Sequence, residues 1–200
     1  MRKISLGIPK LNWPKAGDEP FVASKNPRHA ARLDMTHRTF GVYACAYKEA
    51  ADRVVACAIR RKTRYPDFDM FPIGFLYRHY LELILKDIIC EGRRCTLKHA
   101  GLLGCHDLLK LWEDARTVIE GLFPAQVGKE MIAAENCISK FNRVDASAQE
   151  FRYPVDTKQQ KTLHALTRVD LRNLKNVMTR LANFLDSTSE AIAEMNRAAK

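Results

Sequence analysis

The stretch Ile73-Gly74-Phe75-Leu76-Tyr77-Arg78-His79-Tyr80-Leu81-Glu82-Leu83-Ile84-Leu85-Lys86-Asp87-Ile88-Ile89 decides the fold of this chain. Wound into a helix, it places apolar side chains around almost the whole circumference. Four polar side chains interrupt this surface at spacings of three and four, which form one narrow stripe: Arg78, His79, Glu82 and Lys86. A helix of this kind belongs at the centre of a helical bundle or in a dimer interface.

Helical periodicity continues on both sides of this stretch. Residues 36–61 repeat apolar groups at spacings of three and four, and Thr36 is suited to cap that helix. The central helix is expected to span residues 67–91 and to stop at Gly92, because glycine commonly ends helices. Further helices are predicted at residues 105–122, 129–146 and 171–195, the last capped by Asp170. No strand pattern is of comparable strength, so the sequence predicts an all-α fold, an antiparallel bundle of about five helices.

The first 36 residues differ from the rest of the chain. They contain four prolines and show no sustained hydrophobic period. We therefore expect an extended arm over residues 1–36, followed by a helical bundle over residues 37–200. A chain of 200 residues with 46% hydrophobic side chains suffices for one domain with a sizeable core.

The net charge of +10 is concentrated near the start of the chain. Residues 1–66 hold 14 Lys and Arg against 5 Asp and Glu, whereas residues 67–200 hold 19 against 18. The densest basic segment contains Arg60, Arg61, Lys62 and Arg64. A basic patch beside aromatic residues fits RNA or another polyanion. The alternative is a solvated helix end or a contact with a protein partner, because basic side chains favour the last turn of a helix.

Cysteine usage and the absence of familiar ligand motifs restrict the chemistry. Three of the six cysteines lie in helical apolar patterns, where a free thiol packs as a small apolar group, so we expect a reducing cytoplasm. No apolar run reaches about 18 residues, and prolines interrupt the start of the chain, so neither a membrane span nor a signal peptide is expected. The sequence has no glycine-rich phosphate loop and no zinc knuckle, and it predicts neither a cofactor nor a metal site.

Three separate segments of the sequence contain polar residues within otherwise apolar surroundings. They are Tyr77-Arg78-His79-Tyr80-Leu81-Glu82-Leu83, continued to Ile89, then His106-Asp107-Leu108-Leu109-Lys110-Leu111-Trp112, then Phe151-Arg152-Tyr153-Pro154. Their order and spacing resemble the HEPN superfamily, small all-α domains of bacterial nucleotidyltransferase pairs, toxins and phage-defence systems. The resemblance spans about residues 70–185.

Active members of this superfamily are metal-independent ribonucleases with an Arg-x4–6-His motif, usually completed across a homodimer. The resemblance implies that Arg152 is the arginine of the motif. In such a site arginine stabilises charge on the phosphate while histidine moves the proton. Positions 157–159 carry Thr157, Lys158 and Gln159 in place of the histidine. A divergent ribonuclease, or an RNA binder that has lost cleavage, is therefore implied, with Lys158 among the RNA contacts and His106 as the candidate catalytic partner of Arg152.

Arg78 is an unusual residue for a core helix. A charged group in such a position needs a partner, and Glu82 lies one turn further on. The resulting ion pair has two interpretations. It either fixes the helix register or a dimer interface, or it lines a pocket for a ligand or RNA.

The polar side chains of the three segments are expected to lie close together in the fold. Asp107 stands at a helix start, where a carboxylate caps exposed amides, and Pro154 holds Tyr153 extended. We expect Arg152 to lie near His106, because buried polar groups need partners. The predicted polar pocket contains Arg78, His79, Glu82, Asp107 and Tyr153.

Two classes of function remain open. In the first, the chain is an RNA-directed protein of a bacterial defence or toxin–antitoxin type, either a metal-independent endoribonuclease or an RNA binder. In the second, it is a non-catalytic helical module that dimerises through the central or the last helix and binds a partner protein. A homodimer is expected in both.

Overall fold

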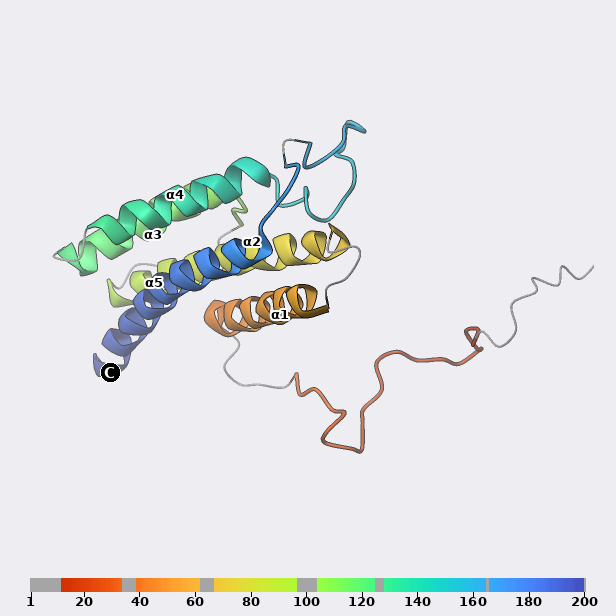
Figure 1. Ribbon diagram of the computed structural model, residues 1–200. Coiled ribbons are helices and arrows are strands. Elements are labelled where there is room, and N and C mark those ends of the chain that lie inside the picture. Colours follow the sequence, from red (N-terminus) through yellow and green to blue (C-terminus); the bar gives the residue numbers. More distant parts are fainter. Residues whose placement is uncertain are drawn as a thin grey trace, which may run out of the picture. The chain divides into compact units, whose positions relative to one another are not determined.

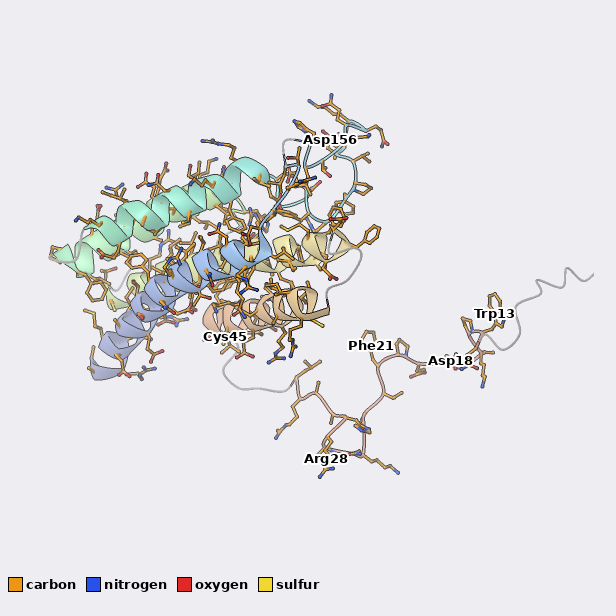
Figure 2. All side chains as sticks on the ribbon, viewed as in Figure 1. Trp13, Asp18, Phe21, Arg28, Cys45 and Asp156 are labelled. Atoms are coloured by element: carbon orange, nitrogen blue, oxygen red, sulfur yellow. The ribbon has the colours of Figure 1, made fainter. Side chains whose placement is uncertain are left out.

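The computed structural model describes residues 12–33, 39–61, 67–96, 104–124, 128–164 and 166–199. The chain separates into two units, Met1–Thr36 and His37–Lys200. Residues 12–33 of the first unit form turns and irregular backbone without a helix or strand, and their side chains, Trp13 and Phe21 among them, are exposed (Figure 2).

The described residues of the second unit form five α-helices (Figure 1). They are α1 (Phe40–Arg61), α2 (Asp67–Cys95), α3 (Leu108–Leu122), α4 (Lys129–Val144) and α5 (Leu171–Ala198). Among the described residues the only extended pairing is one isolated bridge, between Val155 and Lys161. The predicted all-α fold is confirmed.

Helix α2 occupies the centre of the bundle, as its apolar circumference predicts. It packs against α1, α3 and α5, while α4 packs on α3 and α5. Figure 1 shows α1 and the α3–α4 pair on opposite sides of α2. Leu81, Leu85 and Ile88 are fully buried, and each such side chain stabilises the fold by about 1.5–3 kcal/mol relative to an exposed position.

Two tyrosines of α2 also form hydrogen bonds to the neighbouring helices α1 and α5. The Tyr77 hydroxyl donates to Asp52 Oδ1 of α1 at 2.7 Å, and the Tyr80 hydroxyl donates to Asp186 Oδ1 of α5 at 2.9 Å. Burial and the adjacent carboxylates raise the pKa of both hydroxyls, which therefore remain donors.

Two aspartates begin helices as their positions in the sequence indicate. Asp107 Oδ1 accepts hydrogen bonds from the first amides of α3 at 2.8 and 3.3 Å, and Asp170 Oδ1 does so for α5 at 2.9 Å in both bonds. Thr36, the expected cap of the first helix, lies outside the described residues. Helix α4 ends at Val144, two residues before the predicted end.

The prediction that the central helix stops at Gly92 is wrong, because α2 continues to Cys95. A Cβ atom on Gly92 would lie 2.1 Å from Cγ1 of Val118 in α3. Glycine is needed at this position for the close approach of two helices and does not end the helix.

A second glycine contact positions the segment that follows α4. A Cβ atom on Gly74 would lie only 2.3 Å from the ring of Phe151, which is buried directly against the α2 backbone. Residues 145–164 are thereby held at the N-terminal half of α2. Arg152 and Tyr153 follow Phe151 immediately and are exposed there.

Candidate functional site

A buried arginine joins three parts of the fold. Arg78 is 1% exposed, and its Nη1 lies 3.0 Å from Glu82 Oε2 on the next turn of α2. Its Nε donates to the carbonyl of Asp145 at 3.3 Å, and its Nη2 donates to the carbonyl of His106. Arg78 therefore ties α2 to the residues before α3 and to the end of α4. This confirms the predicted Arg78–Glu82 pair.

Glu82 has two further partners. Its Oε1 accepts a hydrogen bond from Lys86 Nζ at 2.8 Å and lies 2.8 Å from His106 Nδ1. Burial alone would raise the pKa of this carboxyl, but the hydrogen bonds from Lys86 and His106 outweigh burial and leave the pKa below its ordinary value. Glu82 is therefore ionised at neutral pH.

His106 presents its imidazole to solvent. Its side chain is 66% exposed although Nδ1 is held by buried Glu82. Since a carboxylate accepts the proton of Nδ1, the neutral ring carries its lone pair on Nε2. Within the described part of the chain Nε2 has no hydrogen-bond partner. The geometry is that of an oriented, solvent-accessible proton acceptor.

Arg152 is exposed and held in one orientation. Its Nε donates to the carbonyl of Ala148 at 2.8 Å. Its guanidinium carbon lies 5.9 Å from the ring centre of Phe75 and 5.5 Å from that of Tyr153, within the range of cation–π attraction. Its terminal nitrogens have no hydrogen-bond partner among the described residues, so they are available to an anion.

Arg152 stands near the end of a row of flat groups, here called the ring row: Tyr47, His79, Phe75, Arg152 and Tyr153. The rings of His79 and Phe75 are stacked, with centres 5.7 Å apart and planes at 7°. Tyr47 of α1 meets His79 edge-on at 4.4 Å. Burial lowers the pKa of His79, and the net effect is a neutral imidazole inside the row.

The predicted polar pocket is distributed over two neighbouring groups. Arg78 and Glu82 form a group, here called the buried cluster, which the exposed His106 contacts through its carbonyl and its Nδ1; Asp107 caps α3 beside it. His79, Arg152 and Tyr153 belong to the ring row. No hydrogen bond or ion pair among the described residues joins Arg152 to the buried cluster. His79 links the two groups electrostatically, since its pKa responds to Glu82, Arg78 and Arg152.

The predicted RNA contacts are exposed where the structure describes them. Arg60 lies in the last turns of α1, with Nε donating to the Ala56 carbonyl at 3.2 Å. Lys158 is exposed in a turn in which Asp156 Oδ1 accepts from the Lys158 amide at 2.8 Å. The Arg61 side chain, and Lys62 and Arg64 as a whole, lie outside the described residues. Figure 1 shows the end of α1, the start of α2 and residues 145–164 at the same end of the bundle.

Sequence reasoning missed Phe75, Tyr47 and Asp145. The spacing of Phe71, Phe75 and His79, one turn apart along α2, was a usable signal for the ring row. Asp145 gave no such signal. It is fully buried, its Oδ2 has no hydrogen-bond partner, and burial together with the neighbouring Glu150 carboxylate raises its pKa to about 6.

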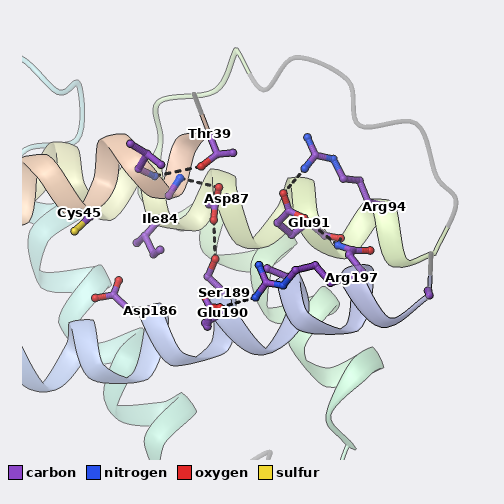
Figure 3. A pocket seen from close by; sticks show the side chains of 15 residues that line it. Thr39, Cys45, Ile84, Asp87, Glu91, Arg94, Asp186, Ser189, Glu190 and Arg197 are labelled. Atoms are coloured by element: carbon purple, nitrogen blue, oxygen red, sulfur yellow. Dashed lines mark hydrogen bonds and ion pairs between the residues drawn. The ribbon is translucent and has the colours of Figure 1, made fainter. Parts of the chain in front are cut away.

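A separate cavity of about 1090 Å³ lies between α1, α2 and α5 (Figure 3). Its central carboxylate, Asp87, accepts from the Gly41 amide at 2.7 Å and from the Ser189 hydroxyl at 2.6 Å. Asp87 therefore holds the start of α1 against α5. The charged groups at the rim pair with one another, Arg94 with Glu91 among them.

Comparisons with protein-family models, with curated proteins and with solved structures found no match for this chain. The six cysteines are free thiols. In the ranges that the structure describes, no group of His, Cys, Asp and Glu side chains is placed to hold a metal ion. No helix in those ranges combines the length and the apolar character needed to cross a membrane.

Proposed function

We propose that this chain is an RNA-directed protein that binds RNA at Arg152 and cleaves it without a metal, with His106 as the proton acceptor. The observation that carries the proposal is the orientation of Arg152. Its guanidinium is fixed by the Ala148 carbonyl and by two rings, while its terminal nitrogens remain unbonded in the described structure. A planar guanidinium held in this way is suited to a phosphate group.

The surroundings of Arg152 favour RNA over a small anion. Aromatic rings stack on bases, and Tyr153 and Phe75 adjoin the guanidinium. Exposed cations, Arg60 and Lys158, would add phosphate contacts, since Figure 1 shows the end of α1 and residues 145–164 at the same end of the bundle. The excess of positive charge in residues 1–66 strengthens the attraction to a polyanion.

The cleavage step uses the oriented imidazole of His106. The RNA 2′-hydroxyl gives its proton to Nε2, and its oxygen forms a bond to the adjacent phosphorus. The bond from phosphorus to the 5′-oxygen breaks, and that oxygen takes a proton from water. The hydroxide that remains takes the proton from Nε2, which restores the neutral imidazole. The products are a 2′,3′-cyclic phosphate and a 5′-hydroxyl end. Arg152 stabilises the negative charge that builds on the phosphate.

The HEPN resemblance supports a site shared by two copies of the chain. It is also the basis for proposing a role in a bacterial defence or toxin–antitoxin system and in the cytoplasm. A shared site agrees with the lack of a hydrogen bond or ion pair between Arg152 and His106 among the described residues. Light scattering should then show a dimer at micromolar concentration, and a monomer would remove the shared site.

A cleavage assay tests the proposal. Purified protein is incubated with end-labelled RNA, with and without EDTA, beside the variants His106→Ala and Arg152→Ala. Cleavage should persist in EDTA and be lost in both variants. Arg180→Ala, which removes an exposed arginine from α5, is the charge-matched control and should cleave normally. Cleavage that EDTA abolishes, or that His106→Ala retains, would contradict the mechanism.

The alternative is a non-catalytic adaptor that binds a partner protein. Exposed aromatic side chains at the start of α2 favour it, since Phe68 is 70% exposed and Phe71 is 48% exposed. Contiguous exposed apolar groups commonly mark protein contacts. A stable dimer that neither binds nor cleaves RNA would favour the adaptor over the RNA-directed protein.

A further inference from the structure

The ring row ends at a tyrosine with an open surface. Tyr153 is 53% exposed, and the Arg152 guanidinium lies 5.5 Å from its ring centre. We propose that Tyr153 stacks on an unpaired base while Arg152 binds a phosphate of the same strand, so that the protein selects single-stranded RNA. This inference rests on the proposed RNA binding and specifies which RNA is bound.

The side chains of the ring row come from three separate parts of the fold. Tyr47 comes from α1, His79 and Phe75 come from α2, and Tyr153 follows α4. Tyr47 meets His79 edge-on, His79 is stacked on Phe75, and the Arg152 guanidinium lies within cation–π range of Phe75 and Tyr153. A base on the exposed Tyr153 ring would lie beside the Arg152 guanidinium, whose carbon is 5.5 Å from that ring centre, so a base and a phosphate of one strand could be bound together.

The backbone of Tyr153 is also fixed. Its amide donates to the Gln149 carbonyl at 3.0 Å, and its carbonyl accepts from the Thr162 hydroxyl at 2.6 Å. Pro154 restricts it further to extended backbone. A side chain held in this way loses little conformational freedom on binding, which favours affinity.

Stacking on a side chain discriminates single strands from duplexes. In a duplex both faces of each internal base are covered by neighbouring bases, and A-form helices hide base edges in a narrow major groove. An unpaired base exposes its face, and aromatic side chains bind it with little preference for sequence. A protein that used Arg152 alone would bind the phosphates of both forms.

Equilibrium binding measurements distinguish a protein that selects single-stranded RNA from one that binds single strands and duplexes alike. The probes are a labelled 2′-O-methyl oligoribonucleotide, which has no free 2′-hydroxyl to cleave, and the same strand in a duplex closed at both ends by linkers. We expect the single strand to bind more tightly than the duplex. Tyr153→Ala should weaken single-strand binding by roughly 5- to 100-fold, the effect of one lost stack, and should weaken duplex binding less, since there only the support of Arg152 is lost. Tyr153→Phe should retain the affinity.

The control variant is Ile132→Ala, which removes an exposed apolar side chain of α4 and should bind as the parent does. Equal affinity for both probes, or an unchanged affinity in Tyr153→Ala, would overturn the selection of single strands while leaving RNA binding intact. If neither probe binds, the proposed function fails as well.

A photocrosslink gives a second readout on the unaltered protein. A 5-bromouridine oligonucleotide joins preferentially to aromatic side chains that stack on the base. The crosslinked peptide should contain Tyr153, as identified by mass spectrometry. A crosslink confined to other peptides would contradict the proposed stack.

Discussion

Glu82 Oε1 lies 2.8 Å from His106 Nδ1, and this contact joins a buried carboxylate to an exposed imidazole. The same carboxylate forms ion pairs with two buried cations. Arg78 Nη1 lies 3.0 Å from Oε2, and Lys86 Nζ lies 2.8 Å from Oε1. Glu82 therefore has two roles. It neutralises charge inside the bundle, and it sets the orientation and tautomer of a histidine at the surface.

Removing Glu82 should strongly destabilise the fold. Glu82→Ala leaves Arg78 and Lys86 buried without a counter-charge, and we expect the free energy of unfolding in urea to fall by about 3–5 kcal/mol. The matched control is Glu49→Ala, which breaks the exposed Arg53–Glu49 pair of α1 and should cost at most about 1 kcal/mol. Similar losses in both variants would show that the buried cluster contributes no more than a surface pair.

Asp145 should make stability depend on pH between 3.8 and about 6. Its folded pKa, raised to about 6 by burial and by Glu150, exceeds the unfolded value of 3.8. Its contribution to stability is therefore complete below pH 3.8 and is lost as pH rises through about 6.

The variant Asp145→Asn resembles the protonated side chain and tests this dependence. At about pH 7.5 we expect its free energy of unfolding to exceed that of the parent by about 1–2 kcal/mol. The difference should narrow as pH falls toward about 4, where the parent carboxyl is itself protonated. Urea titrations across this range measure it, and a difference that is constant with pH would rule out titration of Asp145.

Gly74 should control the position of Arg152. A Cβ atom at Gly74 would meet the Phe151 ring at 2.3 Å, so Gly74→Ala should displace residues 145–164 and cost about 1–3 kcal/mol. Gly121→Ala in α3 is the control, because its Cβ would meet nothing within 4 Å, and it should stabilise the helix by about 0.5–1 kcal/mol. Thermal melts compare the two. Equal changes in melting temperature for the two variants would show that the Phe151 ring can move away from Gly74 at little cost in stability.

Local signals in the sequence were sufficient for much of the fold. The apolar circumference of residues 73–89 predicts the central place of α2, since such a surface must be covered on every side. Asp107 and Asp170 were recognisable as caps because capping acts over two or three residues. The Arg78–Glu82 pair followed from a spacing of four on one helix.

Contacts between segments distant in the sequence could not be predicted from local patterns in the same way. The bond between Glu82 and His106 joins positions 24 residues apart, and its partners depend on how α3 packs on α2. The cation–π contact of Arg152 with Phe75 likewise depends on the burial of Phe151 against Gly74. Gly92 was misread because a glycine that ends a helix and one that admits a neighbouring helix look alike in sequence.

The most direct test of the proposed function is the affinity for single-stranded RNA as salt is raised from about 50 to about 200 mM, measured for the parent and for Arg152→Ala. For the parent, the logarithm of the binding constant should fall linearly with the logarithm of salt concentration, by about 0.7 for each phosphate contacted. Arg152→Ala should bind more weakly and lose about one such increment of slope, while its melting temperature stays unchanged because Arg152 is exposed and forms no ion pair in the described structure. Absence of binding at the lowest salt, a response that does not vary with salt, or equal affinity in the variant would contradict RNA binding at Arg152.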